Sequence, residues 1–152
     1  LSDALQSSKV VMQAGAQMVK VEGGAWLAET VQVLTRNGIP VCVHLGLTPQ
    51  SVHVFGGYKL QARTREAADQ LIADCQAVVD AGAAVLLLEC VPAQLGKEIS
   101  ELFPQVPVIG IGAGVDTDGQ VLVVQDMLGL TFGRVAKFVR NFMKQQAGET
   151  AI

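Results

Sequence analysis

The feature that most constrains the fold is a helix-to-strand unit that occurs twice. Residues 11–22 (VMQAGAQMVKVE) and 78–89 (VVDAGAAVLLLE) each end a helical pattern with Ala-Gly, pass through small residues into an apolar run and finish on glutamate. Glycine in this place is typical of the left-handed residue that ends a helix. A second pair, 39–46 (IPVCVHLG) and 106–113 (VPVIGIGA), opens with Pro-Val, and proline is tolerated at the start of a strand. The repeat therefore predicts strands that follow helices.

Read along the whole chain, the apolar pattern predicts short strands separated by helices. The expected elements are a helix to about residue 14, strand 17–22, helix 25–36, strand 40–45, a loop over 46–63, helix 64–81, strand 84–89, helix 93–103 and strand 106–112, then a weaker helix, a short strand and a final helix within 119–146. Continuously apolar strands that alternate with helices are typical of a parallel sheet covered by helices on both faces.

The spacing of the strand ends favours one kind of α/β fold. The ends at residues 22, 44, 89 and 112 are evenly spaced, except for one gap of about double length that contains the 46–63 loop. Even helix–strand units predict a (β/α)8 TIM barrel, which needs eight units in roughly 250 residues. Because 152 residues hold about five units and the first residue is Leu1 rather than methionine, we expect a piece of such a barrel.

Three of the predicted strands that follow a helix end in polar or charged residues. These are Lys20 and Glu22 on the first strand, His44 on the second and Glu89 on the third. In a parallel barrel the functional groups gather at the carboxyl ends of the strands, so these four side chains are candidates for one site. Each of them taken alone is more often a solvated loop residue or a salt-bridge partner, and it is the four together that favour a site.

Composition excludes several classes of function. The net charge of −3 does not suit a nucleic-acid surface, which needs a basic patch. No apolar run approaches the ~18 residues of a membrane span, so we expect no membrane insertion. The cysteines, Cys42, Cys75 and Cys90, are odd in number and have no metal-binding spacing, which is typical of reduced packing residues in a cytosolic protein.

The 46–63 loop carries two features of its own. Its Gly56-Gly57 pair is compatible with the hinge of a lid and equally with an ordinary turn. His53 lies in this loop and is expected to be a surface residue. It is not expected to be a metal ligand, because the two histidines and three cysteines of the chain give no zinc-site spacing.

Four stretches of the chain resemble one known enzyme family. The strings VKVEGG (19–24), HLGLTPQSV with FGGYK (44–59), LLLEC (86–90) and IGIGAG (109–114) occur in the order found in ketopantoate hydroxymethyltransferases. The resemblance implies an α/β fold, the (β/α)8 TIM barrel of the phosphoenolpyruvate-mutase-like group, with residues 1–152 as the C-terminal part of a single barrel domain. It also implies a cytoplasmic homo-oligomer, typically a decamer.

The resemblance also implies a reaction. Members of the family transfer a hydroxymethyl group from 5,10-methylenetetrahydrofolate to the small 2-oxo acid 3-methyl-2-oxobutanoate, which gives 2-dehydropantoate for pantothenate and coenzyme A synthesis. By position, Glu22 matches a ligand of Mg2+, Lys20 and His44 match substrate-binding residues, and Glu89 matches the proton acceptor. Magnesium prefers oxygen ligands and polarises a bound carbonyl, which suits enolate chemistry.

The chain departs from the family pattern at its beginning. Two further magnesium carboxylates and a substrate-binding serine lie on earlier strands of the family's barrel, and those strands are absent here. We therefore expect an isolated chain of these 152 residues to be nearly inactive. Two alternatives remain open: another Mg2+-dependent lyase or mutase of 2-oxo acids from the same barrel group, and a non-catalytic fragment that associates through exposed strand edges.

Overall fold

A parallel sheet forms the centre of the structure, a computed structural model that describes residues 1–144. Its strands are β1 (Val19–Glu22), β2 (Val41–Gly46), β3 (Val85–Glu89), β4 (Val108–Ile111) and the short β5 (Gly119–Gln120). The strand order is β1-β2-β3-β4-β5, and every neighbouring pair is parallel. The predicted alternation of helix and parallel strand is therefore confirmed for this part of the chain.

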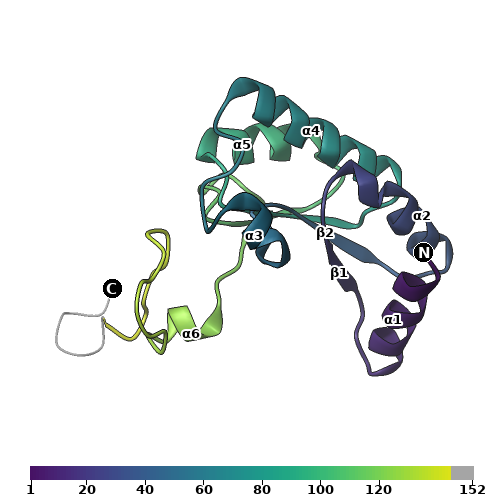
Figure 1. Ribbon diagram of the computed structural model, residues 1–152, viewed down its shortest axis with the longest axis horizontal. Coiled ribbons are helices and arrows are strands. Elements are labelled where there is room, and N and C mark those ends of the chain that lie inside the picture. Colours follow the sequence, from purple (N-terminus) through teal and green to yellow (C-terminus); the bar gives the residue numbers. More distant parts are fainter. Residues whose placement is uncertain (145–152) are drawn as a thin grey trace.

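Helices connect successive strands (Figure 1). They are α1 (Ser2–Gln13), the 3-10 helix η1 (Ala25–Leu27), α2 (Ala28–Arg36), the 3-10 helix η2 (Pro49–Ser51), α3 (Val52–Phe55), α4 (Arg65–Asp80), α5 (Ala93–Leu102) and α6 (Val124–Met127). The expected helices 64–81 and 93–103 are confirmed to within a residue at each end. The expected helix 25–36 divides into η1 and α2, and the expected 46–63 loop contains η2 and α3.

Three of these helices end in the same way, which explains the repeat in the sequence. Gly15, Gly38 and Gly82 have φ values of 104°, 76° and 102°, in the left-handed region. After each glycine, the next residue donates its N–H back to the carbonyl three residues before the helix cap, as in Ala83 to Val78 at 3.0 Å. This arrangement satisfies the last carbonyls of the helix and turns the chain into the following strand.

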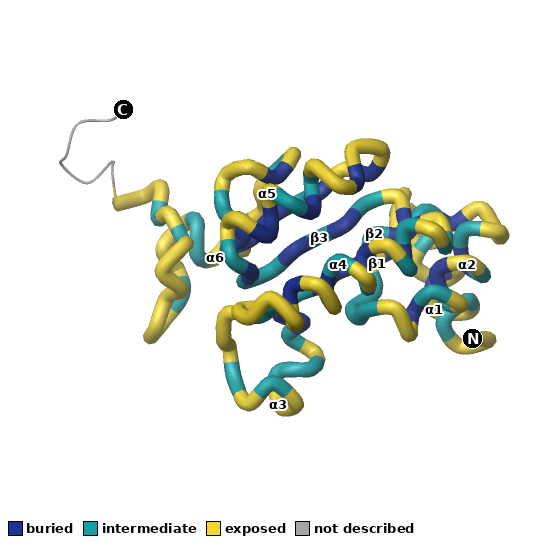
Figure 2. The backbone as a smooth tube through the Cα atoms, turned by 90° about the horizontal axis from the view of Figure 1, so that it is seen from above, coloured by how far each residue is buried: buried dark blue, intermediate teal, exposed yellow. Residues whose placement is uncertain are grey.

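The two faces of the sheet differ in what covers them. Alternate residues of the strands, such as Val41, Val43 and Leu88, are buried against α2, α4 and α5. In the described residues these helices lie on one side of the sheet. Figure 1 shows α4 and α5 above the strands, and Figure 2 shows β3 as mostly buried. The expectation of helices on both faces is wrong for residues 1–144. The other face carries Lys20, Glu22, His44 and Glu89.

The described sheet is open, with β1 and β5 as its edges. Five parallel strands in sequence order are compatible with part of a barrel, but closure does not occur within residues 1–144. No helix in this part of the chain is both long and apolar enough to cross a membrane.

The C-terminal part differs from the expected helix, strand and helix over 119–146. The strand β5 comes first, α6 is a single turn, and no helix follows within 128–144; residues 145 and 146 lie outside the described part. Gly129 and Gly133 have left-handed φ values of 69° and 91°, which a continuing helix does not allow. The side chain of Phe132 is 99% exposed, so little burial supports a helix there.

We predict that the core depends on the buried side of α5. Leu95→Ala removes a side chain that is 4% exposed, and the expected loss of unfolding free energy is about 2–5 kcal/mol. Leu102→Ala on the same helix removes a side chain that is 51% exposed, and the expected loss is below about 1 kcal/mol. Urea unfolding of both variants measures the difference, and equal losses would contradict this account of the core.

Candidate functional site

Three neighbouring strand ends bring their polar side chains together. Glu22 lies opposite His44 in the β1–β2 register, and Glu89 lies opposite Gly46, two residues beyond His44. Because side chains alternate between the faces of a strand, Glu22, His44 and Glu89 all project from the face that the helices leave uncovered. The sequence predicted that these three residues would share one site, and the structure brings them together.

The imidazole of His44 stands between the two carboxylates. Its Nδ1 is 3.4 Å from Oε1 of Glu22, and its Nε2 is 3.1 Å from Oε2 of Glu89. The three side chains are 3%, 8% and 16% exposed for His44, Glu22 and Glu89. The low exposure strengthens the electrostatic attraction between an imidazolium and these carboxylates compared with the same pair in water.

Both contacts are within ion-pair distance, but neither is a hydrogen bond. Both ring nitrogens of His44 are buried and have no hydrogen-bond partner among the described residues. A buried nitrogen in this state costs about 1–3 kcal/mol, so a polar ligand that bonds to it gains that energy. An imidazole next to two carboxylates is also able to pass a proton between a ligand and Glu89 or Glu22.

Lys20 lies on the same face but outside this trio. It is opposite Cys42 in the register, its side chain is exposed, and it forms no ion pair within residues 1–144. Burial raises the pKa of the Cys42 thiol, and the positive charge of Lys20 opposes that rise. Lys20 therefore lies two residues before Glu22 on β1, and the amine of Lys20 is available to an anionic ligand.

The cysteines are free thiols that burial holds in the protonated form. Burial raises the pKa of Cys75 to about 12, and Cys75 belongs to the helix-covered core. The pKa of Cys90 is raised first by burial and then by the charge of its neighbour Glu89. A protonated thiol is a weak nucleophile, so these residues pack as the sequence predicted. The expected surface position of His53 is also confirmed, because that residue is exposed.

One polar group at the site was not found from the sequence. The backbone N–H of Gln50 in η2 donates to Oε2 of Glu22 at 3.1 Å. Proline at the first position of a helix is typical of a helix start, where the first N–H groups have no partner inside the helix. The sequence Thr48-Pro49-Gln50 carries that signal, but nothing local indicates which side chain accepts the bond.

The described residues fit a magnesium ion only in part. Within residues 1–144 no group of three or more His, Cys, Asp or Glu side chains has an arrangement that would hold a metal ion. Magnesium is usually held by one or two carboxylates together with water and substrate oxygens. Glu22 is a suitable single ligand, with one oxygen already bonded to Gln50 and the other beside His44. Residues 1–144 therefore do not form a complete magnesium site.

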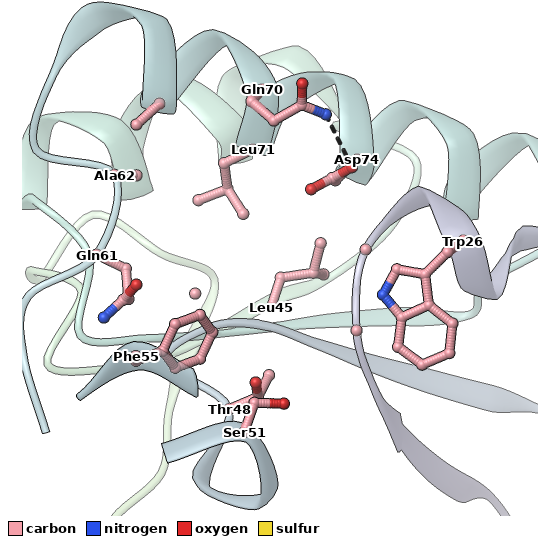
Figure 3. A pocket seen from close by; sticks show the side chains of 14 residues that line it. Trp26, Leu45, Thr48, Ser51, Phe55, Gln61, Ala62, Gln70, Leu71 and Asp74 are labelled. Atoms are coloured by element: carbon pink, nitrogen blue, oxygen red, sulfur yellow. Dashed lines mark hydrogen bonds between the residues drawn. The ribbon is translucent and has the colours of Figure 1, made fainter. Parts of the chain in front are cut away.

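A cavity of about 380 Å3 lies beside the trio, on the helix side of the sheet. Trp26 and Phe55 stand on either side of Leu45, and Asp74 with Gln70 faces them from α4 (Figure 3). Leu45 belongs to the strand face that is opposite to His44. The helix η2 contacts both the cavity and the trio, because Ser51 lines the cavity while the N–H of Gln50 meets Glu22.

Comparison with known proteins decides the family. A sequence model described as ketopantoate hydroxymethyltransferase matches residues 1–151. The chain belongs to the ketopantoate hydroxymethyltransferase family. It is 88% identical over 152 residues to the 3-methyl-2-oxobutanoate hydroxymethyltransferase of Acinetobacter baumannii (strain AYE) and 84% identical to that of Acinetobacter baylyi, and it covers 56% of each. It is 58% identical over 149 residues to that of Psychrobacter sp. (strain PRwf-1), of which it covers 55%.

The chain therefore spans about half the length of the curated ketopantoate hydroxymethyltransferases that it matches. The match runs through the whole of the described structure, including Glu22, His44 and Glu89.

We predict that the close approach of β2 to β3 at the site requires glycine at position 46. A Cβ there would collide with the backbone oxygen of Glu89, and the φ of Gly46 is 83°. Gly46→Ala is therefore expected to lower the unfolding free energy by more than about 2 kcal/mol. Gly38→Ala has a similar φ of 76° but open space around the Cβ, so its expected loss is about 1 kcal/mol. Denaturant unfolding compares the two, and a loss for Gly46→Ala no larger than for Gly38→Ala would show that no such contact exists.

Proposed function

We propose that the protein carrying this chain transfers a hydroxymethyl group from 5,10-methylenetetrahydrofolate to 3-methyl-2-oxobutanoate and releases 2-dehydropantoate. The observation that carries the proposal is the match of nearly the whole chain to the ketopantoate hydroxymethyltransferase family, with relatives of that enzyme name at 84–88% identity. The cluster of Glu22, His44 and Glu89 at adjacent strand ends supports it, because enolate chemistry needs a base and a polar pocket.

Glu89 takes the proton in the proposed reaction. Its carboxylate is next to Nε2 of His44, on the face of the sheet that α2, α4 and α5 do not cover, and it is the most exposed side chain of the trio. Removal of the proton from C3 of the oxo acid gives an enolate, and C3 then forms a bond to the one-carbon unit. Both C–N bonds of the methylene bridge break, and water supplies the hydroxyl oxygen. The two protons of water and the one taken by Glu89 end on the hydroxyl group and on the two folate nitrogens, so that tetrahydrofolate leaves. His44 donates to or accepts from the substrate through its unpaired ring nitrogens.

Two further groups act on the charge of the substrate. The exposed amine of Lys20 lies two residues from Glu22 and attracts the carboxylate of the oxo acid. Magnesium, when bound, supplies Lewis-acid polarisation of the substrate carbonyl, and Glu22 is the residue of this chain that we assign to it. Residues 1–144 offer a single suitable ligand for the metal, so we expect an isolated chain of these residues to have low activity.

The proposed reaction takes place in the cytoplasm and in a homo-oligomer, decameric in the family, as the family resemblance implies.

The role of Glu89 leads to a kinetic prediction for the full-length protein. Glu89→Gln keeps the shape of the side chain but removes its basicity, so the expected kcat is at least about 100-fold lower while KM for the oxo acid changes less than about threefold. Glu98→Gln, the same substitution in an ion pair with Arg65 on the helix side, is the matched control and should keep both constants. A kcat for Glu89→Gln close to that of the parent would remove Glu89 from the base role.

The role of Glu22 leads to a metal titration. In the full-length protein, Glu22→Ala should need at least about tenfold more Mg2+ for half-maximal turnover, because one of few carboxylate ligands is lost. Glu29→Ala removes an exposed glutamate of α2 and should leave the titration unchanged. If the two variants show the same Mg2+ midpoint as the parent, Glu22 is not a ligand.

A further inference from the structure

Residues 47–61, which we name the covering segment, follow β2, lead toward α4 and meet the site at three points. At its start, the N–H of Leu47 donates to the carbonyl of Glu89 at 2.8 Å. At its end, the N–H of Gln61 donates to the carbonyl of Cys90, also at 2.8 Å. Between them, the N–H of Gln50 donates to the carboxylate of Glu22 at 3.1 Å. Both ends of the covering segment are therefore bonded to consecutive residues at the end of β3.

The second of these attachments holds strained backbone. Cys90 and Ala62 are the non-glycine residues with positive φ in the described chain, at 50° and 51°. This conformation costs roughly 1–2 kcal/mol for a residue with a Cβ and persists only where the surroundings determine it. Cys90 is bonded on both sides, since its N–H donates to Ile111 at 2.9 Å and its carbonyl accepts from Gln61. The strain thus lies where the covering segment meets the residue after Glu89.

The middle attachment determines how the Glu22 carboxylate is turned. Gln50 bonds to Oε2, and Oε1 is then the oxygen that faces Nδ1 of His44. A carboxylate has two oxygens in one rigid plane, so a fixed Oε2 restricts the position of Oε1. The side chain of Gln50 is exposed and makes no hydrogen bond to the described residues, so the backbone of Gln50 makes this contact.

We propose that the covering segment positions the two carboxylates of the site, and that Gln50 is a positioning residue which acts through its backbone N–H on Glu22. The end attachments hold the backbone of Glu89 and Cys90, and the middle attachment holds the side chain of Glu22. A hydrogen bond to a charged acceptor contributes about 1.5–3 kcal/mol, which is enough to select one orientation of the carboxylate. The expected effect on turnover rests on the proposed function, whereas the orientation of the Glu22 carboxylate by Gln50 does not.

The first test removes the N–H of Gln50 in the full-length protein. Gln50→Pro deletes the donor at a position where the N–H has no partner inside η2, and Gln50→Ala keeps the donor and deletes the side chain. We expect kcat/KM for the oxo acid to fall at least about tenfold in Gln50→Pro and to stay within about twofold in Gln50→Ala. Circular dichroism should match the parent in both variants, and the melting temperature should fall in Gln50→Pro only, because that variant alone loses the hydrogen bond to Glu22. Parent-like kcat/KM in both variants, or equal losses, would overturn the proposal.

The second test needs no turnover and so separates this proposal from the proposed function. Hydrogen–deuterium exchange at single-residue resolution follows the amide of Gln50 in the parent, in Glu22→Ala and in Glu22→Gln. We expect the amide of Gln50 to exchange at least about tenfold faster in Glu22→Ala. In Glu22→Gln its rate should stay within about threefold of the parent, because glutamine keeps an acceptor oxygen; this variant controls for the loss of charge. The amide of Ser51, bonded to Thr48 at 2.8 Å, is the internal control. Unchanged exchange of Gln50 in Glu22→Ala overturns the proposal even if the enzyme is active.

If the parent has no transferase activity, the proposed function fails while the exchange experiment still decides the positioning role. If the parent is active and exchange at Gln50 is unaffected by Glu22→Ala, the function stands and the positioning role is wrong.

Discussion

The site depends on the parallel register of β1, β2 and β3. This register sets Glu22 beside His44 and places Glu89 one strand further along, so that three polar side chains from distant parts of the sequence meet on one face. A slip of β1 by one residue would exchange Glu22 with Val21 and direct the carboxylate toward the helices. Burial of an unpaired carboxylate in that apolar layer is costly, so the packing of Val41, Val43 and Leu88 against the helices also fixes the chemistry on the opposite face.

Much of this arrangement follows from local sequence. The glycines at 15 and 82 indicate where helices end, and the apolar runs after them indicate strands because each is too short and too continuous for a surface helix. Once strands are parallel, their carboxyl ends lie at one edge of the sheet, and Glu22, His44 and Glu89 fall there by simple counting. The roles assigned to these residues came from the family resemblance, not from the pattern, since a strand-end glutamate is compatible with many functions.

Other features depend on contacts between distant parts of the chain and have no local signal. The bonds from Leu47 to Glu89 and from Gln61 to Cys90 join backbone atoms, and backbone atoms are the same in every sequence. The left-handed conformation of Cys90 also has no signal in the sequence, because a cysteine by itself favours negative φ. The expected final helix failed in the described part because periodicity alone does not form a helix where side chains such as Phe132 stay exposed.

We propose that His44 and its two flanking carboxylates receive the substrate as a unit. A crystal structure of the full-length protein with bound 3-methyl-2-oxobutanoate tests it most directly. The oxo acid is expected on the uncovered face of the sheet, within hydrogen-bond distance (about 3 Å) of a ring nitrogen of His44 and beside the carboxylate of Glu89. An oxo acid bound elsewhere, or side chains of Glu22 and Glu89 turned away from His44, would contradict it.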